Sequence, residues 1–453
     1  MNVRRFANGA RSRRFSALIA LLIAGALVLV LRAVAYAHAT LVSSEPAAGS
    51  RLATSPTRVR LVFSEQVEPS LTQLSLVAGN GDVTHLTVAG DAHDVHAVVA
   101  PVAGLAPGAY RLTWRVVSAD GHPVGGSFVF SVGVGASQPP STPNDTAATV
   151  SRTTWGPTLM GAPLVPAVLR GLGVGTLMAL AGVLLFLSLP RAPGEPVARR
   201  AARLASWLAL ATSVFLALHL AAWILNVTPD HQLNGESTPA VLASGVGKVE
   251  LWRTGLALLA VWAVWLARRP RLALLFACIA LAVSGASGHS AAIDPLWAMP
   301  AKALHLSAGA AWLGGLLWLV VADRRDARSF ARDASRVSTI ALAAVVVVAL
   351  SGVVQAWLFL PSPWDLFRSS YGAVTLAKIA GVIVLVAFGA FHRYRVLPRL
   401  EGDATVARRF AASLGGEVVI MCFILLLGGL LAYISPPRRL ERHVASMHSS
   451  APK

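Results

Sequence analysis

The residues best suited to chemistry are a histidine near the start of the chain and an acid–histidine pair further along. His38 directly follows Ala35-Tyr36-Ala37, a small-residue site of the kind that signal peptidases cut. Cleavage there would make His38 the N-terminus, and its free amine and ring Nδ1 could chelate one metal ion. Asp120 and His122 supply a carboxylate and a second imidazole. Three nitrogens and one oxygen suit Cu(II), so the sequence predicts a copper site that forms only after processing.

The spacing of the acid–histidine pair supports this hypothesis. Asp120 and His122 are two apart, and side chains at i and i+2 leave one face of a strand. Pro123 favours an extended backbone at His122. Glu65 is a further candidate, as an axial ligand or a neighbour of the site, with a solvated strand end as the alternative. Asp-Gly-His-Pro is also typical of a β-turn, which is the alternative for the motif itself.

The first 37 residues have the organisation of a signal peptide. Arginines cluster before residue 15, and an apolar run then extends from Phe15 to Leu31. An uncleaved first membrane helix is the alternative, because the apolar run is long. We expect residues 1–37 to be a signal peptide and the segment after it to be exported.

Residues 38–134 alternate apolar and polar side chains in short runs. The segments 58–63 and 110–116 are clear examples, and turns rich in glycine and proline separate such runs. This pattern predicts a small all-β domain, an immunoglobulin-like sandwich or a Greek-key barrel. Residues 135–158 are rich in Ser, Thr, Pro, Gly and Ala, which indicates a linker.

The rest of the chain has the composition of a polytopic membrane protein. The 453 residues are 55% hydrophobic and only 13% charged. Apolar stretches of about 20 residues predict about eight helical spans within a membrane domain of residues 159–436, followed by an exported tail of residues 437–453. The expected spans are 162–189, 204–227, 250–267, 272–289, 301–321, 337–360, 373–392 and 412–434.

The net charge of +18 does not indicate nucleic-acid binding. Arginines gather in alternate loops, around 191–203, 268–271, 324–336 and 393–409, and the opposite loops hold few. This asymmetry predicts a multi-pass protein of the cytoplasmic membrane with the β domain on the extracytoplasmic side. Both cysteines, Cys278 and Cys422, lie in apolar runs, so neither a disulfide framework nor a cysteine metal cage is expected in the exported domain.

Histidines near the exported ends of the spans are candidates for a metal path. His219, His289 and His305 share this depth, and Met299 offers a thioether that suits Cu(I). Interfacial anchoring is the alternative for each histidine. We expect His392, among arginines at the opposite boundary, to be an interfacial residue. Lys378 and Glu417 are also unusual within spans and could pair across helices, or Lys378 could snorkel.

Two stretches carry a family resemblance. Residues 38–47, Phe63-Ser64-Glu65 and 114–123 resemble the CopC family of periplasmic copper-binding proteins. The resemblance implies that His38, Asp120 and His122 bind Cu(II) and that Glu65 lies near the same site. Some CopC members have a Met-rich Cu(I) loop, but no methionine lies between His38 and Gly133.

The membrane part resembles the CopD family of copper-resistance proteins, in Gly288-His289-Ser290-Ala291, in 305–315 and in 412–417. The whole chain is therefore similar to CopC–CopD fusions. We expect a copper homeostasis protein that is not an enzyme. It would capture Cu(II) outside and carry copper inward as Cu(I) or Cu(II). Exported copper-donating proteins are expected partners. Alternatives are copper sensing or sequestration without transport, and a histidine-brace oxidase or membrane reductase.

Overall fold

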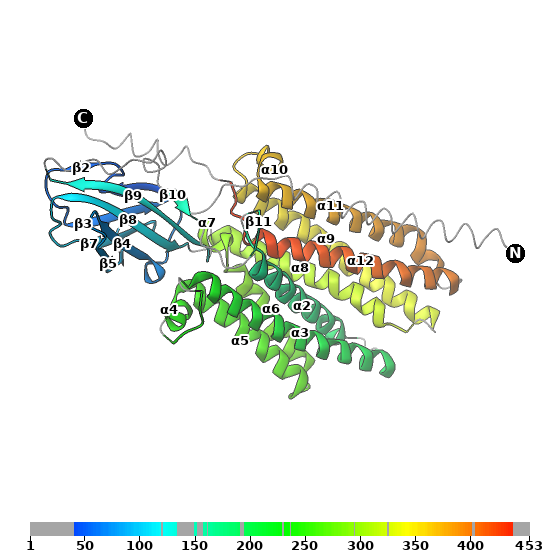
Figure 1. The fold of residues 1–453 in the computed structure, drawn as a ribbon. Coiled ribbons are helices and arrows are strands. Elements are labelled where there is room, and N and C mark those ends of the chain that lie inside the picture. The colour runs from blue at the N-terminus through cyan, green and yellow to red at the C-terminus, as the bar shows by residue number, and fades with distance from the viewer. Residues whose placement is uncertain are drawn as a thin grey trace.

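The computed structural model places a β-sandwich at one end of a helical bundle (Figure 1). It describes residues 40–118, 121–133, 149–151, 157–160, 162–190, 194–228, 231–235, 237–293, 295–323, 326–400 and 404–437. The predicted signal peptide lies outside these residues, and so does nearly all of the predicted exported tail. The predicted fold class, a β-sandwich followed by a helical membrane domain, is confirmed.

The sandwich contains two antiparallel sheets. The smaller sheet has the order β1-β3-β7-β6, formed by Leu41–Glu45, Arg58–Phe63, Ala97–Pro101 and Ala89–Gly90. The larger has the order β10-β9-β8-β4-β5, formed by Thr149–Ser151, Pro123–Val132, Gly108–Val117, Gln73–Ala78 and Val83–Leu86. The short strand β2 (Arg51–Leu52) pairs in parallel with β9. Strand β10 lies within the stretch predicted to be a linker.

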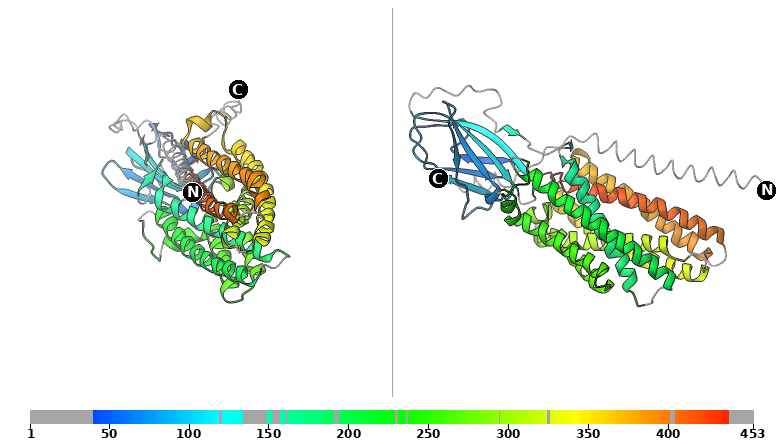
Figure 2. Two further views of the ribbon diagram at one scale, coloured as in Figure 1. Left: turned by 90° about the vertical axis from the view of Figure 1, so that its right-hand side faces the viewer. Right: turned by 60° about the horizontal axis from the view of Figure 1, so that its bottom comes forward.

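Alternation along the strands places large apolar side chains between the two sheets. Phe63 on β3 and Trp114 on β8 meet edge to face with ring centroids 5.2 Å apart, and both are buried. Tyr110 stacks on Phe130 and donates its hydroxyl proton to Ala106 O at 2.8 Å. The buried phenol is therefore satisfied, and the long β8–β9 pair forms a rigid ribbon. Its hairpin end points toward the helices (Figures 1 and 2).

Each of the eight predicted spans coincides with a helix in the described part of the chain. They are α2 (Leu164–Ser188), α3 (Glu195–Val227), α5 (Gly245–Trp265), α6 (Pro270–Gly285), α8 (Pro295–Val321), α9 (Ala327–Phe359), α11 (Ser370–Phe391) and α12 (Ala404–Leu431). Short helices connect them: α4 (Ser237–Ala243), α7 (His289–Ile293) and α10 (Asp365–Arg368). The hairpin Thr158–Leu159/Ala162–Pro163 (β11 and β12) precedes α2.

Six of these helices are long and apolar enough to cross a membrane: α2, α3, α8, α9, α11 and α12. Helix α6 is apolar but shorter, and α5 carries Lys248, Glu250 and Arg253 in its first half. The number eight is therefore approximate as a count of complete spans. The multi-pass membrane character itself is supported.

Helix α2 lies at the centre of the bundle and packs against α3, α6, α8 and α12. Small residues allow this close approach. An added Cβ at Gly182 on α2 would lie 2.6 Å from Gly314 Cα on α8, and one at Gly171 would lie 3.1 Å from Leu426 Cα on α12. Such contacts are typical of helix packing in membranes, where backbone proximity replaces the hydrophobic effect.

Candidate metal path

The structure places His122 at the contact between the sandwich and the bundle. His38 and Asp120, the other two predicted ligands of the exported site, lie outside the described residues. Ser118 N donates to His122 O at 3.0 Å, and Gly121 has a φ of +89°. The described residues of this segment thus form a turn between β8 and β9, the alternative to strand geometry that the sequence left open. A positive φ favours glycine and reverses the chain here.

His122 contacts aromatic side chains of the helical domain. Its ring centroid lies 5.8 Å from that of His289, at the start of α7, in a stacked arrangement. It lies 5.1 Å from that of Tyr433, just after α12, in an edge-to-face arrangement. His122 and His289 are 3% and 6% exposed. Two predicted candidates from different domains are therefore brought together in one buried place.

An apolar interface holds the hairpin in this position. Val117 of the sandwich packs in one buried cluster with Trp223 of α3 and Val246 of α5. Trp223 Nε1 donates to Gly121 O at 3.3 Å. A Cβ at Gly121 would lie 3.1 Å from that same indole nitrogen, so a larger residue would force the indole to move.

Arg115 adds a polar contact to this interface. Its Nη2 lies 3.5 Å from Thr228 O, at the end of α3. Burial lowers the pKa of Arg115 to about 10. The guanidinium still remains charged near neutral pH, because that value lies well above 7. The hairpin is therefore docked through both apolar packing and a charged donor.

A hydrogen bond of His289 fixes the tautomer of its neutral ring. Its Nε2 lies 2.9 Å from Ile434 O, and a carbonyl only accepts, so Nε2 carries the proton. In the neutral ring Nδ1 then has the lone pair that a metal requires. Metal-binding histidines commonly donate their other N–H to a backbone carbonyl in this way. Tyr371 of α11 completes the surroundings, with ring centroids 6.1 Å apart.

His219, another predicted candidate, is placed differently. Arg253 Nη2 donates to its Nδ1 at 3.0 Å, so Nε2 carries the proton and donates to the Tyr433 hydroxyl at 3.0 Å. Both nitrogens are occupied in this arrangement. His219 therefore holds Tyr433, the neighbour of His122, and offers no lone pair to a metal ion.

A buried ionic cluster surrounds His219, and the sequence analysis missed it. Glu250 of α5 pairs with Arg253 and lies 3.6 Å from Arg170 Nη1 of α2. Arg170 Nη2 also contacts Ser287 Oγ at 2.7 Å, just before the Gly288-His289 pair. The missed signal was an acidic residue inside a predicted span, which is costly unless it is paired. The cluster ties α2, α5 and the His289 loop together.

His305 and Met299 lie on α8, apart from these rings. Ser351 Oγ of α9 donates to Val347 O at 2.6 Å, so it accepts from His305 Nδ1 at 3.0 Å. His305 Nε2 then has the lone pair in the neutral ring. Lys378 Nζ lies 3.8 Å from the position of a Cβ at Gly428, and it is not paired with Glu417 as the sequence allowed. The side chain of Met299 is half-buried.

Glu65 is the remaining candidate of the exported site within the described residues, and three polar contacts lie elsewhere on the sandwich. Glu65 is half-buried in the bend after β3. His85 is exposed beside Ser75, and His96 pairs with Asp94 at 3.3 Å. Arg60 binds Asp91 at 2.7 Å, and this hydrogen bond lowers the pKa of the Asp91 carboxyl.

The described residues contain no group of three or more His, Cys, Asp or Glu side chains that could hold a metal ion. This result does not test the exported site, because two of its predicted ligands lie outside those residues.

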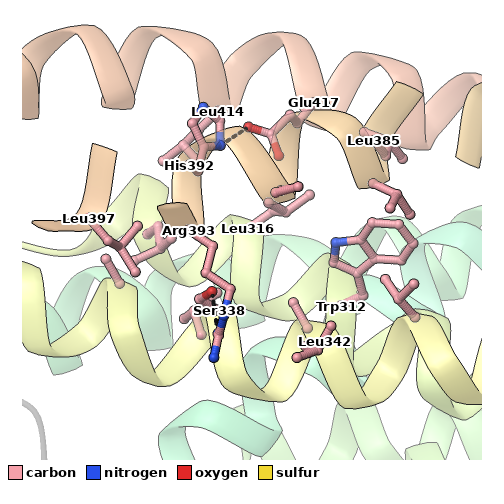
Figure 3. A pocket seen from close by; sticks show the side chains of 18 of the residues that line it. Trp312, Leu316, Ser338, Leu342, Leu385, His392, Arg393, Leu397, Leu414 and Glu417 are labelled. Atoms are coloured by element: carbon pink, nitrogen blue, oxygen red, sulfur yellow. Dashed lines mark hydrogen bonds and ion pairs between the residues drawn. The ribbon is translucent and has the colours of Figure 1, made fainter. Parts of the chain in front are cut away.

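A buried histidine–glutamate pair joins α11 and α12 (Figure 3). His392, in the π-helical turn His392–Val396 that continues α11, is 3.2 Å from Glu417 of α12, measured from Nδ1 to Oε1. His392 is 7% exposed, so its side chain is buried inside the bundle, and its position at the membrane boundary stays a prediction. Both residues line a mostly apolar pocket between α8, α9, α11 and α12. Their pairing could not be predicted from the sequence, because 25 positions and a reversal of the chain separate them.

Comparison with known families accounts for most of the chain. Residues 41–133 match the CopC domain, residues 160–299 match the copper resistance protein D-like N-terminal domain, and residues 331–431 match copper resistance protein D. The three matches follow one another in the order of the sandwich and the two halves of the bundle.

Individual relatives agree with this division. The copper transport protein CutJ of Bacillus subtilis is 25% identical over 83% of this chain and 71% of its own length. Copper resistance protein C of Pseudomonas syringae pv. tomato is 36% identical over 25% of this chain and 93% of its own length. The crystal structure of CopC from Methylosinus trichosporium OB3b is 32% identical, covers 22% of this chain and 98% of its own, and has a TM-score of 0.21.

Proposed function

Because this chain belongs to the CopC–CopD family of copper resistance and copper transport proteins, we propose that it captures Cu(II) with its sandwich and carries copper inward across the cytoplasmic membrane. His38, Asp120 and His122 would hold the captured ion after cleavage behind Ala37, with Glu65 beside them. The proposal assigns copper as the cargo and the sandwich as its first binding site.

The observation that carries the proposal is the buried contact between His122 and His289. A copper ion bound by His122 would lie close to the imidazole of His289 in the membrane domain, since the two ring centroids are 5.8 Å apart. Ligand exchange between the two imidazoles would then move copper without releasing it to water. A sequestration protein has no need of a second imidazole at this place.

His289 and His305 would then be successive ligands along the path. The hydrogen bond of each ring fixes its tautomer, with the proton on Nε2 in His289 and on Nδ1 in His305. Met299 on the same helix as His305 would offer a thioether to Cu(I). His219 would act indirectly, by holding Tyr433 against His122.

The arginine asymmetry of the loops supports the proposed orientation, with the sandwich outside and the 393–409 segment inside. Inward flux would therefore begin at His122 and end near the inner arginines. An oxidase is disfavoured, because His122 is covered by the helical domain and a bulky substrate would not reach it.

Isotopic copper uptake into sealed vesicles containing the processed protein tests the proposal. We expect His289→Ala and His305→Ala each to reduce the initial uptake rate at least tenfold, while His93→Ala, on the exposed surface of the sandwich, retains it. Insertion and the amount of folded protein are compared for all variants. Undiminished uptake in the His289→Ala, His305→Ala double variant would overturn the path, and absence of uptake by the wild-type protein would overturn transport.

A further inference from the structure

The inner histidine–glutamate pair has a proton arrangement that the hydrogen bonds define. Ser413 Oγ donates its one proton to Phe410 O at 2.7 Å. It can therefore only accept from His392 Nε2, which lies 3.0 Å away. The Nε2 proton of His392 is thus fixed on the side away from Glu417.

The other nitrogen faces the carboxyl group. His392 Nδ1 lies 3.2 Å from Glu417 Oε1, a buried oxygen that accepts no hydrogen bond from the described residues. A lone pair on Nδ1 opposite an ionised carboxylate would be repulsive, so one further proton belongs between these atoms. It can reside on the imidazole or on the carboxylic acid.

The surroundings of this proton are mostly apolar. Glu417 is 3% exposed, and the pocket beside the pair is lined mainly by apolar groups such as Trp312 and Leu316. The other ionisable residues that line it are Arg393 and Tyr394. Arg393 Nη1 donates to Ser338 Oγ of α9 at 2.9 Å, on the side away from Glu417 (Figure 3).

We propose that His392 and Glu417 form a proton-binding site whose proton is exchanged for the charge of copper passing through the inner half of the bundle. When copper arrives, the N–H or O–H bond between the pair breaks and the proton leaves to water. The carboxylate that remains supplies one negative charge for the cation. No electron is transferred. Ionisable side chains within spans are costly and commonly serve ion or proton movement, which agrees with this role.

The exchange rests on the proposed copper transport, but the proton site itself does not. The first experiment therefore needs no copper. Infrared difference spectra of the full-length protein in nanodiscs are recorded while the pH is changed, for wild type, Glu417→Gln and Glu195→Gln. Glu195 is a matched control, because it is an exposed glutamate at the start of α3.

We expect a carboxyl band of the wild-type and Glu195→Gln spectra to be absent from that of Glu417→Gln. A weaker band shift is expected for Ser413→Ala, which removes the acceptor of the Nε2 proton and so frees the imidazole to turn. Spectra that are identical in wild type and Glu417→Gln would overturn the proton site.

The second experiment measures protons released as copper enters vesicles, with a pH-sensitive dye in the lumen. We expect copper uptake by the wild type to be accompanied by a change of pH in the lumen. The pH change per copper ion should be at least tenfold smaller in Glu417→Gln and His392→Gln, and it should equal the wild-type value in Glu195→Gln. Copper uptake with unchanged coupling in Glu417→Gln would overturn the exchange. If the wild type takes up no copper, the proposed function fails, and the infrared result still decides the proton site.

Discussion

Replacing Trp223 by alanine tests whether docking of the sandwich matters for copper transfer. Trp223 is 2% exposed, and it joins α3 to the β8–β9 hairpin through packing and through its hydrogen bond to Gly121 O. The substitution removes both contacts and leaves the predicted ligands in place. We expect the sandwich to lose its fixed position on the bundle and copper transfer to slow.

The buried contacts of Trp223 set the size of the expected loss in docking free energy. A buried Trp covers about 150–250 Å², and if about half of that area faces the hairpin, at about 25 cal/mol per Å² it contributes about 2–3 kcal/mol. The hydrogen bond adds about 1 kcal/mol. A loss of about 3–4 kcal/mol lowers the ratio of docked to undocked protein by a factor on the order of 100 or more. Trp223→Phe, which keeps most of the area, should cost about 1 kcal/mol and lower the ratio about fivefold.

Pulsed electron–electron double resonance provides the assay. Spin labels at Val83 and Leu233, both exposed, report the distance between sandwich and bundle in a background without Cys278 and Cys422. We expect a broader and longer distance distribution and slower copper uptake in Trp223→Ala, with intact copper binding by the sandwich. Trp207→Ala is the matched control, because Trp207 lies on the same helix and is 64% exposed. An unchanged distribution together with unchanged uptake in Trp223→Ala would refute the docking argument.

Three further outcomes are expected. One residue added before His38 should strongly weaken Cu(II) binding in a chelator competition, because the amine moves away from the ring; equal affinities would exclude the amine chelate. Binding should also weaken as the pH falls from about 8 to 6, since an amine of pKa about 7.7–8.0 and imidazoles of pKa about 6.5 must lose protons to bind; a flat titration contradicts this. Gly182→Ala should lower the thermal unfolding midpoint, because its Cβ would lie 2.6 Å from Gly314 Cα, whereas Gly389→Ala, with no atom within 4 Å, should not; equal midpoints would contradict the packing argument.

Periodicity and hydropathy predicted the elements well, because each depends on residues close in the chain. Helix ends were less accurate. Helix α9 begins at Ala327 instead of 337, since Asp326 accepts from Arg328 N and Ser329 N and the helix continues through arginines. Arginine is a good helix former, and a hydropathy window detects only the apolar part of such a helix.

The contacts that organise the candidate path could not be predicted in the same way. The packing of His122 on His289, the cluster around Glu250 and the His392–Glu417 pair each join distant segments. Composition identified several of these residues as unusual within spans. Only the fold shows which of them meet, because pairing depends on helix register and on the docking of the hairpin.

Single-turnover transfer of one bound copper ion tests the central claim most directly. Processed protein in sealed vesicles is loaded with one equivalent of isotopic Cu(II), washed, and followed as the label leaves the sandwich. The account predicts that the label appears in the lumen of wild-type vesicles and stays outside in His289→Ala vesicles, with His93→Ala equal to wild type. Equal delivery to the lumen by wild type and His289→Ala would contradict transfer from His122 to His289.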